Sequence, residues 1–178
     1  MIKIEVSPIE TYNANTNMFT MVPGGVLVLE HSLIAISKWE QITHKPFFSK
    51  GGKTYEETIL YIKGMTLNNV DPTIYDNLTL DNMNAIQTYM EDSNTAIVFR
   101  AETRNANVEQ MTFETIYYWM FSLGIPKECE KWHINKLLNL IKVINLKNKK
   151  PSEADRKSIN ARNKNIMAQR RAARKKRG

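Results

Sequence analysis

The chain has 178 residues, a length typical of one main domain with an appended segment. Hydrophobic residues make up 42% of it and aromatic residues 9%, which is enough to build a buried core and excludes a wholly disordered chain. The single cysteine, Cys129, excludes an intramolecular disulfide. The start, MIKIEVSPIE, lacks the apolar run of a secretory signal. No stretch approaches the ~18 consecutive apolar residues of a spanning helix. We therefore expect an intracellular protein with no membrane partner.

The charge is distributed unevenly along the chain. The net charge is +7, but residues 1–126 carry 8 Lys and Arg against 14 Asp and Glu, a net charge of −6. Residues 127–178 carry +13, of which +11 lies from residue 147 onward. We therefore predict a mildly acidic globular domain over residues 1–146 and a basic C-terminal tail over residues 147–178.

The first 30 residues predict a small β-element of three strands. Apolar and charged residues alternate over Ile2–Val6, which is typical of a half-buried strand. The polar stretch Thr11–Asn17 predicts a loop. Two apolar runs, Met18–Val22 and Val26–Leu29, flank the triplet Pro23-Gly24-Gly25. That triplet predicts a hairpin turn between the last two strands.

The middle of the chain predicts four helical segments, each with a recognisable start. Ser32 precedes apolar residues at helical spacing, and the loop Lys45–Gly52 follows that helix. Thr54 begins the next helix and forms a capping box with Glu57. The pair Asp71-Pro72 predicts a short helical turn. The fourth helix begins after Thr79 and has an apolar stripe, followed by an expected strand over Thr95–Arg100; the stripe residues are Met83, Ile86 and Met90.

The C-terminal half of the domain predicts two helices packed as an antiparallel hairpin. Thr112 caps the first, which carries Phe113, Tyr117, Met120 and Phe121 and ends at Gly124. The second begins after Pro126 and carries Cys129, Trp132, Leu137 and further apolar residues to Ile144. A tight turn between them would place this hairpin at the centre of the domain. The fold class is therefore mainly α with a small N-terminal β-element, an α+β fold.

The stretch Gly51-Gly52-Lys53-Thr54 resembles the end of a phosphate-binding P-loop. A P-loop requires a glycine five positions before the Gly-Lys pair, and Phe47 occupies that place. The preceding His44-Lys45-Pro46 is a poor end for a strand. We therefore favour a plain loop leading into a capped helix over a nucleotide-binding enzyme that uses Lys53.

The other reactive side chains of the sequence do not form a catalytic or metal-binding set. Cys129 and His133 are four residues apart and could share a metal on one helix, but two ligands do not make a site. Glu128 and Glu130 flank the thiol and disfavour its thiolate. We predict a protein that is not an enzyme and that uses no cofactor.

The aromatic residues of the helix hairpin allow a stacking surface or a core. They are Tyr117, Tyr118, Trp119 and Trp132, and their helical spacing and apolar neighbours favour the core.

The basic tail is the one segment that core packing does not explain. Three interpretations stay open: binding nucleic acid through phosphate contacts, docking on an acidic protein surface, and a solvated segment without a dedicated partner. The cations that we expect to bind a partner are Arg162, Lys164, Arg170, Arg171, Arg174, Lys175, Lys176 and Arg177.

Three stretches resemble a family of small proteins found in the structural gene clusters of tailed bacteriophages. They are LEHSLIAISKWEQITHKPF (Leu29–Phe47), TIYYWMFSLGIPKECEKWHINKLLNLIKV (Thr115–Val143) and the final NARNKNIMAQRRAARKKRG. The middle stretch is the most specific, because an aromatic helix, a Gly-Ile-Pro break and Cys-x-x-Trp-His before a leucine-rich helix form an uncommon pattern. Together the stretches cover about 40% of the chain, and weaker similarity extends through Tyr55–Met65.

This resemblance implies a tail assembly chaperone or a related tail structural component, and it supplies no catalytic residues. The implied partners are tail proteins, either the tape-measure or the tail-tube protein, and an oligomer is compatible with that role. The implied location is the host cytoplasm during assembly, or the virion. The alternative is a nucleic-acid-binding virion or packaging protein that acts through the basic tail.

Overall fold

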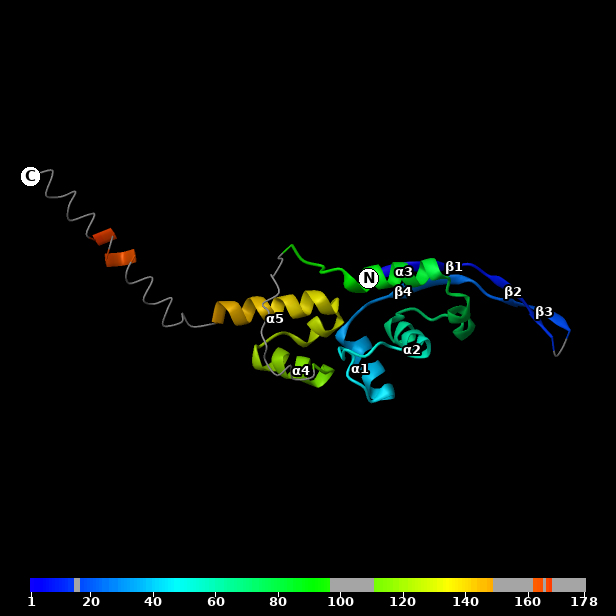
Figure 1. Cartoon of the computed structure of the whole chain (residues 1–178), viewed down its shortest axis with the longest axis horizontal. Coiled ribbons are helices and arrows are strands. Elements are labelled where there is room, and N and C mark those ends of the chain that lie inside the picture. Colours follow the sequence, from blue (N-terminus) through cyan, green and yellow to red (C-terminus); the bar gives the residue numbers. More distant parts are fainter. Residues whose placement is uncertain (15–16, 97–110, 149–161, 165, 168–178) are drawn as a thin grey trace, which may run out of the picture. The chain divides into compact units, whose positions relative to one another are not determined.

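In the computed structural model, described residues 1–14, 17–96, 111–148, 162–164 and 166–167 form an α+β fold, as expected. The chain divides into two units, Met1–Lys142 and Val143–Gly178. Strands come first and helices follow (Figure 1). The elements in chain order are β1 (Ile2–Val6), β2 (Ile9–Asn13), β3 (Met18–Val22), β4 (Gly25–Leu29), α1 (Leu33–Thr43), α2 (Tyr55–Met65), the 3₁₀ helix η1 (Pro72–Asn77), α3 (Leu80–Glu91), α4 (Phe113–Ser122), the 3₁₀ helix η2 (Lys127–Lys131) and α5 (Ile134–Asn148).

The β-element is a long two-stranded antiparallel ribbon rather than a three-stranded one. β1 pairs with β4, so that Ile2 faces Leu29, and β2 pairs with β3, so that Ile9 faces Val22. The two registers are in step, because two residues separate the paired segments on each strand. The ribbon therefore runs in one register from its base at β1 and β4 to its far end at β2 and β3, as Figure 1 shows.

Two predictions for this region are wrong. The expected loop Thr11–Asn17 contains most of strand β2, whose Thr and Tyr residues favour extended backbone. The expected turn at Pro23-Gly24-Gly25 is a passage between β3 and β4, and the chain reverses beyond β2 instead. In the continued register Pro23 faces Pro8. Because proline has no N–H to donate, the ladder of hydrogen bonds is interrupted here and the ribbon splits into two sheets.

The predicted starts of the helices are largely confirmed. Ser32 accepts a hydrogen bond from the Ala35 N–H at the start of α1, and Thr54 and Glu57 form the full capping box of α2. Thr79 caps α3 in the same way, and Asp71 caps η1, which is a 3₁₀ helix. The loop between α1 and α2 is also as expected.

The core lies between the base of the ribbon and the helices. One face of the ribbon contributes Ile4, Val6, Leu27 and Leu29, all buried. Helix α1 packs against α2, α4 and η2, and α3 packs along β1. From α1, Leu33 and Ile36 are fully buried. The helix α1 is therefore the element around which the other helices of this unit are arranged.

The expected tight turn between two long helices is not formed. A 3₁₀ helix, η2, follows Pro126, and α5 begins only at Ile134. Cys129 and Trp132 therefore precede α5 instead of lying on it. Pro126 precedes this segment, and the Trp132 N–H donates a 3₁₀ hydrogen bond to the Cys129 carbonyl oxygen. The segment is therefore a short 3₁₀ helix and not the first turns of α5.

Two sequence predictions reach residues that the structure does not describe. Most of the expected strand Thr95–Arg100 lies outside the described residues. Residues 162–164 and 166–167 are helical. The boundary between the globular domain and the basic tail at residue 147 stays a prediction.

A substitution at Gly24 tests how closely the two strands approach each other where the ladder of hydrogen bonds is interrupted. A Cβ atom there would lie 2.5 Å from the Val6 carbonyl oxygen and 2.5 Å from the Pro8 nitrogen. We expect Gly24→Ala to lower the free energy of unfolding by about 1–3 kcal/mol, as overpacking does, measured by urea unfolding. Gly52→Ala is the control, because no atom lies within 4 Å of its added Cβ. Equal stability of the two variants would contradict this close approach of the two strands.

Candidate functional site

The carboxylate of Glu40 joins three parts of the fold. Glu40 is on α1 and only 7% exposed. Its Oε1 accepts the Phe47 N–H at 2.6 Å, and its Oε2 accepts the Phe113 N–H at 2.9 Å. Phe113 is the first residue of α4. A side chain of α1 therefore holds the loop after α1 and caps a helix 73 residues further along the chain.

This finding corrects the predicted cap of α4. Thr112 occupies the N-cap position, but its side chain accepts no hydrogen bond from the backbone of the helix. Glu40 supplies the acceptor instead, and its negative charge lies at the positive end of the helix dipole. The expected capping residue is thus in the right place, while the capping group comes from another element.

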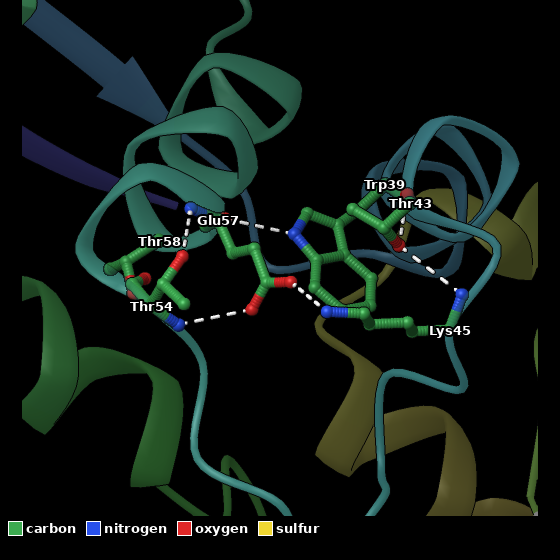
Figure 2. A network of polar contacts seen from close by, with 6 residues as sticks. All are labelled: Trp39, Thr43, Lys45, Thr54, Glu57 and Thr58. Atoms are coloured by element: carbon green, nitrogen blue, oxygen red, sulfur yellow. Dashed lines mark hydrogen bonds and ion pairs between the residues drawn. The ribbon is translucent and has the colours of Figure 1, made fainter.

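A second polar network joins the end of α1 to the start of α2 (Figure 2). The indole N–H of Trp39 donates to the Glu57 carbonyl oxygen at 2.8 Å. The Glu57 side chain accepts from Lys45 at 2.6 Å and from the Thr54 N–H at 3.0 Å. Each of these residues therefore has a structural contact, and together they fix the angle at which the chain enters α2.

A third cluster is buried and contains two histidines in edge-to-face contact. The ring centroids of His31 and His133 are 5.0 Å apart. His31 Nδ1 lies 2.5 Å from the Tyr61 hydroxyl. His133 Nε2 lies 3.1 Å from the Tyr89 carbonyl oxygen, and its Nδ1 accepts the Asn135 N–H. Because a carbonyl only accepts, Nε2 of His133 carries the proton and the ring is neutral.

The surroundings of both histidines oppose a positive charge. Burial, with the nearby His133 and Lys53, lowers the pKa of His31 to about 3. Burial also lowers the pKa of His133, against the opposing effect of the Tyr89 carbonyl. Burial raises the pKa of Tyr61 well above its usual value, which keeps its hydroxyl protonated beside His31.

The residues of the P-loop-like stretch do not form a phosphate cradle. The Lys53 ammonium donates to the Phe47 carbonyl oxygen at 2.8 Å and lies 3.9 Å from the centroid of the Phe47 ring. Phe47 is buried and part of an aromatic cluster with Trp39 and Tyr61. The residue at the place of the missing glycine is thus a core residue that also holds the lysine.

Cys129 and His133 do not lie on one helix. Cys129 is buried in η2, and His133 precedes α5 with both ring nitrogens in hydrogen bonds. Within the described ranges, no group of three or more His, Cys, Asp or Glu residues is placed to hold a metal ion.

The core interpretation of the aromatic residues is wrong for two of the four. Tyr118 is 68% exposed and Trp132 is 37% exposed, whereas Tyr117 and Trp119 are half-buried. Phe121 is also exposed, and the buried residues of α4 are Ile116 and Met120. Helical spacing alone did not distinguish the inner from the outer aromatic residues, because aromatic side chains occupy both sides of α4.

The far end of the ribbon exposes apolar side chains that the sequence reasoning missed. Tyr12 and Phe19 face each other across β2 and β3 with ring centroids 5.1 Å apart, and they are 53% and 68% exposed. Ile9, Met18 and Met21 on the same strands are exposed as well. Reading Thr11–Asn17 as a loop hid this surface, since a strand would have indicated which residues align.

Of the cations predicted to bind a partner, the structure describes two. Arg162 and Lys164 are helical and exposed. The other six, Arg170, Arg171, Arg174, Lys175, Lys176 and Arg177, lie outside the described residues. The structure therefore does not test whether these eight side chains form one surface.

No helix in the described parts of the chain is long and apolar enough to cross a membrane. Comparison with protein-family profiles, with characterised proteins and with solved structures gives no match.

The capping role of Glu40 can be tested by a change that keeps its shape. In Glu40→Gln, the side-chain amide can accept one of the two backbone N–H groups but faces the other with an NH₂ group. We expect the free energy of unfolding, measured by urea titration, to fall by about 2 kcal/mol, because that is the typical contribution of a hydrogen bond to a charged group. Glu114→Gln removes the same charge from an exposed position in the first turn of α4 and should have little effect. An equal loss in both variants would contradict the role of Glu40.

The buried histidines predict a loss of stability in acid. The pKa of His31 is about 3 in the folded protein and near 6.5 in the unfolded chain. Between these values the unfolded chain binds more protons, so the free energy of unfolding falls as the pH is lowered through this range, by up to about 1.4 kcal/mol per pH unit. Urea unfolding at successive pH values measures the slope. His31→Gln should flatten it, and His44→Gln, at an exposed position, should leave it unchanged.

Proposed function

We propose that this protein is a non-enzymatic phage tail morphogenesis protein that acts by protein–protein contacts, as a tail assembly chaperone or a tail-associated structural component. The observation that carries the proposal is the exposed apolar surface at the far end of the ribbon. The likeness of three stretches of the sequence to phage structural-cluster proteins supplies the biological setting.

The ribbon surface is suited to contact with another protein. Its two strands carry one charged residue, Glu10, and lack the lysines that natural sheets use to protect exposed edges. Aromatic residues and methionine are the types enriched in protein interfaces. A surface of this kind can cover apolar or unpaired segments of a partner, which is the task of an assembly chaperone.

The use of the buried polar groups also supports a binding role. Glu40, His31, His133 and Asn77 are buried, and each has a hydrogen-bond partner within the fold. Among the described residues, no buried side-chain nitrogen or oxygen lacks a partner. These hydrogen bonds hold the buried side chains in place within the fold.

The ribbon can be tested by removing its aromatic pair. We expect the double variant Tyr12→Ser and Phe19→Ser to recover at least tenfold less tape-measure or tail-tube protein on co-expression and affinity purification, since buried aromatic residues dominate interface energies. The control is Tyr55→Ser with Leu80→Ser, which removes an exposed aromatic and an exposed apolar side chain elsewhere. Unchanged recovery in the ribbon variant would contradict the proposal.

The alternative, a nucleic-acid-binding virion or packaging protein, is favoured by the net charge of +11 from residue 147 onward. It predicts that the full chain retains DNA or RNA at low salt and loses it steeply as the salt concentration rises. Deleting residues 151–178 should abolish this retention, measured by filter binding. Retention that survives the deletion would exclude the basic tail as the binding element.

A further inference from the structure

An apolar groove lies between α2, α3 and the loop that precedes α2. Its volume is about 380 Å³, within the range of ligand sites. The walls include Phe47 from the loop, Ile62 from α2, and Met83, Ile86 and Met90 from α3. Lys53 is the only charged residue among those that line it.

We propose that this groove binds an apolar segment of a partner protein, and that a carboxylate of this segment pairs with the ammonium group of Lys53. The inference rests on the proposed function as a protein-binding component, and it assigns a second contact site distinct from the ribbon.

Lys53 is a cation without a counter-ion in contact. It is half-buried, and its ammonium donates to the Phe47 carbonyl oxygen at 2.8 Å. No carboxylate in the described part of the chain forms an ion pair with it. Burial lowers the pKa of Lys53 in spite of the opposing influence of Glu57 and Glu40. An incoming carboxylate would therefore stabilise the charged lysine.

The two nearest carboxylates are already engaged in the fold. Glu40 accepts backbone N–H groups from Phe47 and Phe113. Glu57 pairs with Lys45 and closes the capping box of α2. Neither can turn toward Lys53 without giving up these contacts, so a carboxylate of a bound segment would not compete with one from the fold.

The apolar walls are adaptable. Met83 and Met90 are half-buried, one turn of α3 before and after the buried Ile86. Methionine is unbranched and fits partners of different shape. The predicted helical stripe of α3 is thus only partly used by the core, and its two methionines remain accessible from the groove.

A protein segment fits this groove better than a nucleotide. Binding a phosphate group typically requires several backbone N–H groups or several cations, whereas the groove has a single lysine and mostly aliphatic and aromatic walls. The glycine that would begin a phosphate cradle is replaced by the buried Phe47. One carboxylate beside apolar side chains matches what the lining offers.

The test uses the methionine methyl groups of the full-length chain as reporters. The probe is the blocked peptide Ser-Leu-Leu-Glu-Leu-Leu-Ser, titrated into protein labelled with ¹³C at the methionine methyl groups. We expect the signals of Met83 and Met90 to shift, while those of Met18 and Met21 on the ribbon stay in place. The same peptide with Gln in place of Glu should bind at least fivefold more weakly.

Two lysine variants separate charge from packing. Lys53→Met removes the charge and should abolish the difference between the Glu and Gln peptides, whereas Lys53→Arg should retain it. Lys53→Met adds one methyl signal of its own, and an unchanged signal of Met120, which is buried in α4 away from the groove, reports that each variant is folded. The inference is overturned if the Met83 and Met90 signals do not respond, or if the two peptides bind equally well to the native chain.

The outcome is independent of the test of the proposed function. If the peptide binds as expected while the ribbon variant still recovers tail proteins at native levels, the groove stands and the ribbon proposal fails. If the ribbon variant loses its partner but the peptide titration is negative, the proposed function stands and the groove does not take part in it.

Discussion

The buried carboxylate of Glu40 is the group on which the arrangement of the helices depends. It holds the loop after α1 through Phe47 and the first turn of α4 through Phe113. Phe47 in turn packs against Tyr61 of α2 and holds Lys53. One side chain therefore connects α1, α2 and α4, although α4 lies far from the other two helices in the sequence. A buried charge is tolerated here because two backbone N–H groups compensate for the loss of water.

The stretch Leu29–Phe47, one of the three on which the proposed phage function draws, contains most of these connecting groups. His31, Trp39, Glu40 and Phe47 all lie in it, and all are buried. These residues serve the fold. The proposed contact surfaces, the ribbon and the groove beside α3, lie mostly on other segments, and Phe47 is the residue of this stretch that also lines the groove.

The sequence predicted what depends on neighbouring residues and missed what depends on distant ones. The caps at Ser32, Thr54 and Thr79 were found because capping involves residues two or three positions apart. The pairing of β2 with β3 and the contact of Glu40 with α4 were missed, since no local pattern specifies them. Pro23-Gly24-Gly25 is wrongly predicted as a turn, because proline and glycine favour turns but also suit a place where two paired strands approach closely without a hydrogen bond. At the candidate site, the sequence points to Lys53 through its P-loop-like neighbours. Its position over the rings of Phe47 and Trp39 depends on the fold and has no local sequence signal.

The facing pair Pro8 and Pro23 has a mechanical consequence for the ribbon. Fewer hydrogen bonds resist bending where the ladder is interrupted, whereas the base is held by the core residues Ile4 and Leu27. A two-stranded sheet is only marginally stable by itself, and the outer strands contact the helices at β3, where the Val22 carbonyl oxygen accepts from Asn77 of η1. We therefore expect the outer strands to change direction, or to fray and re-form, more readily than the base.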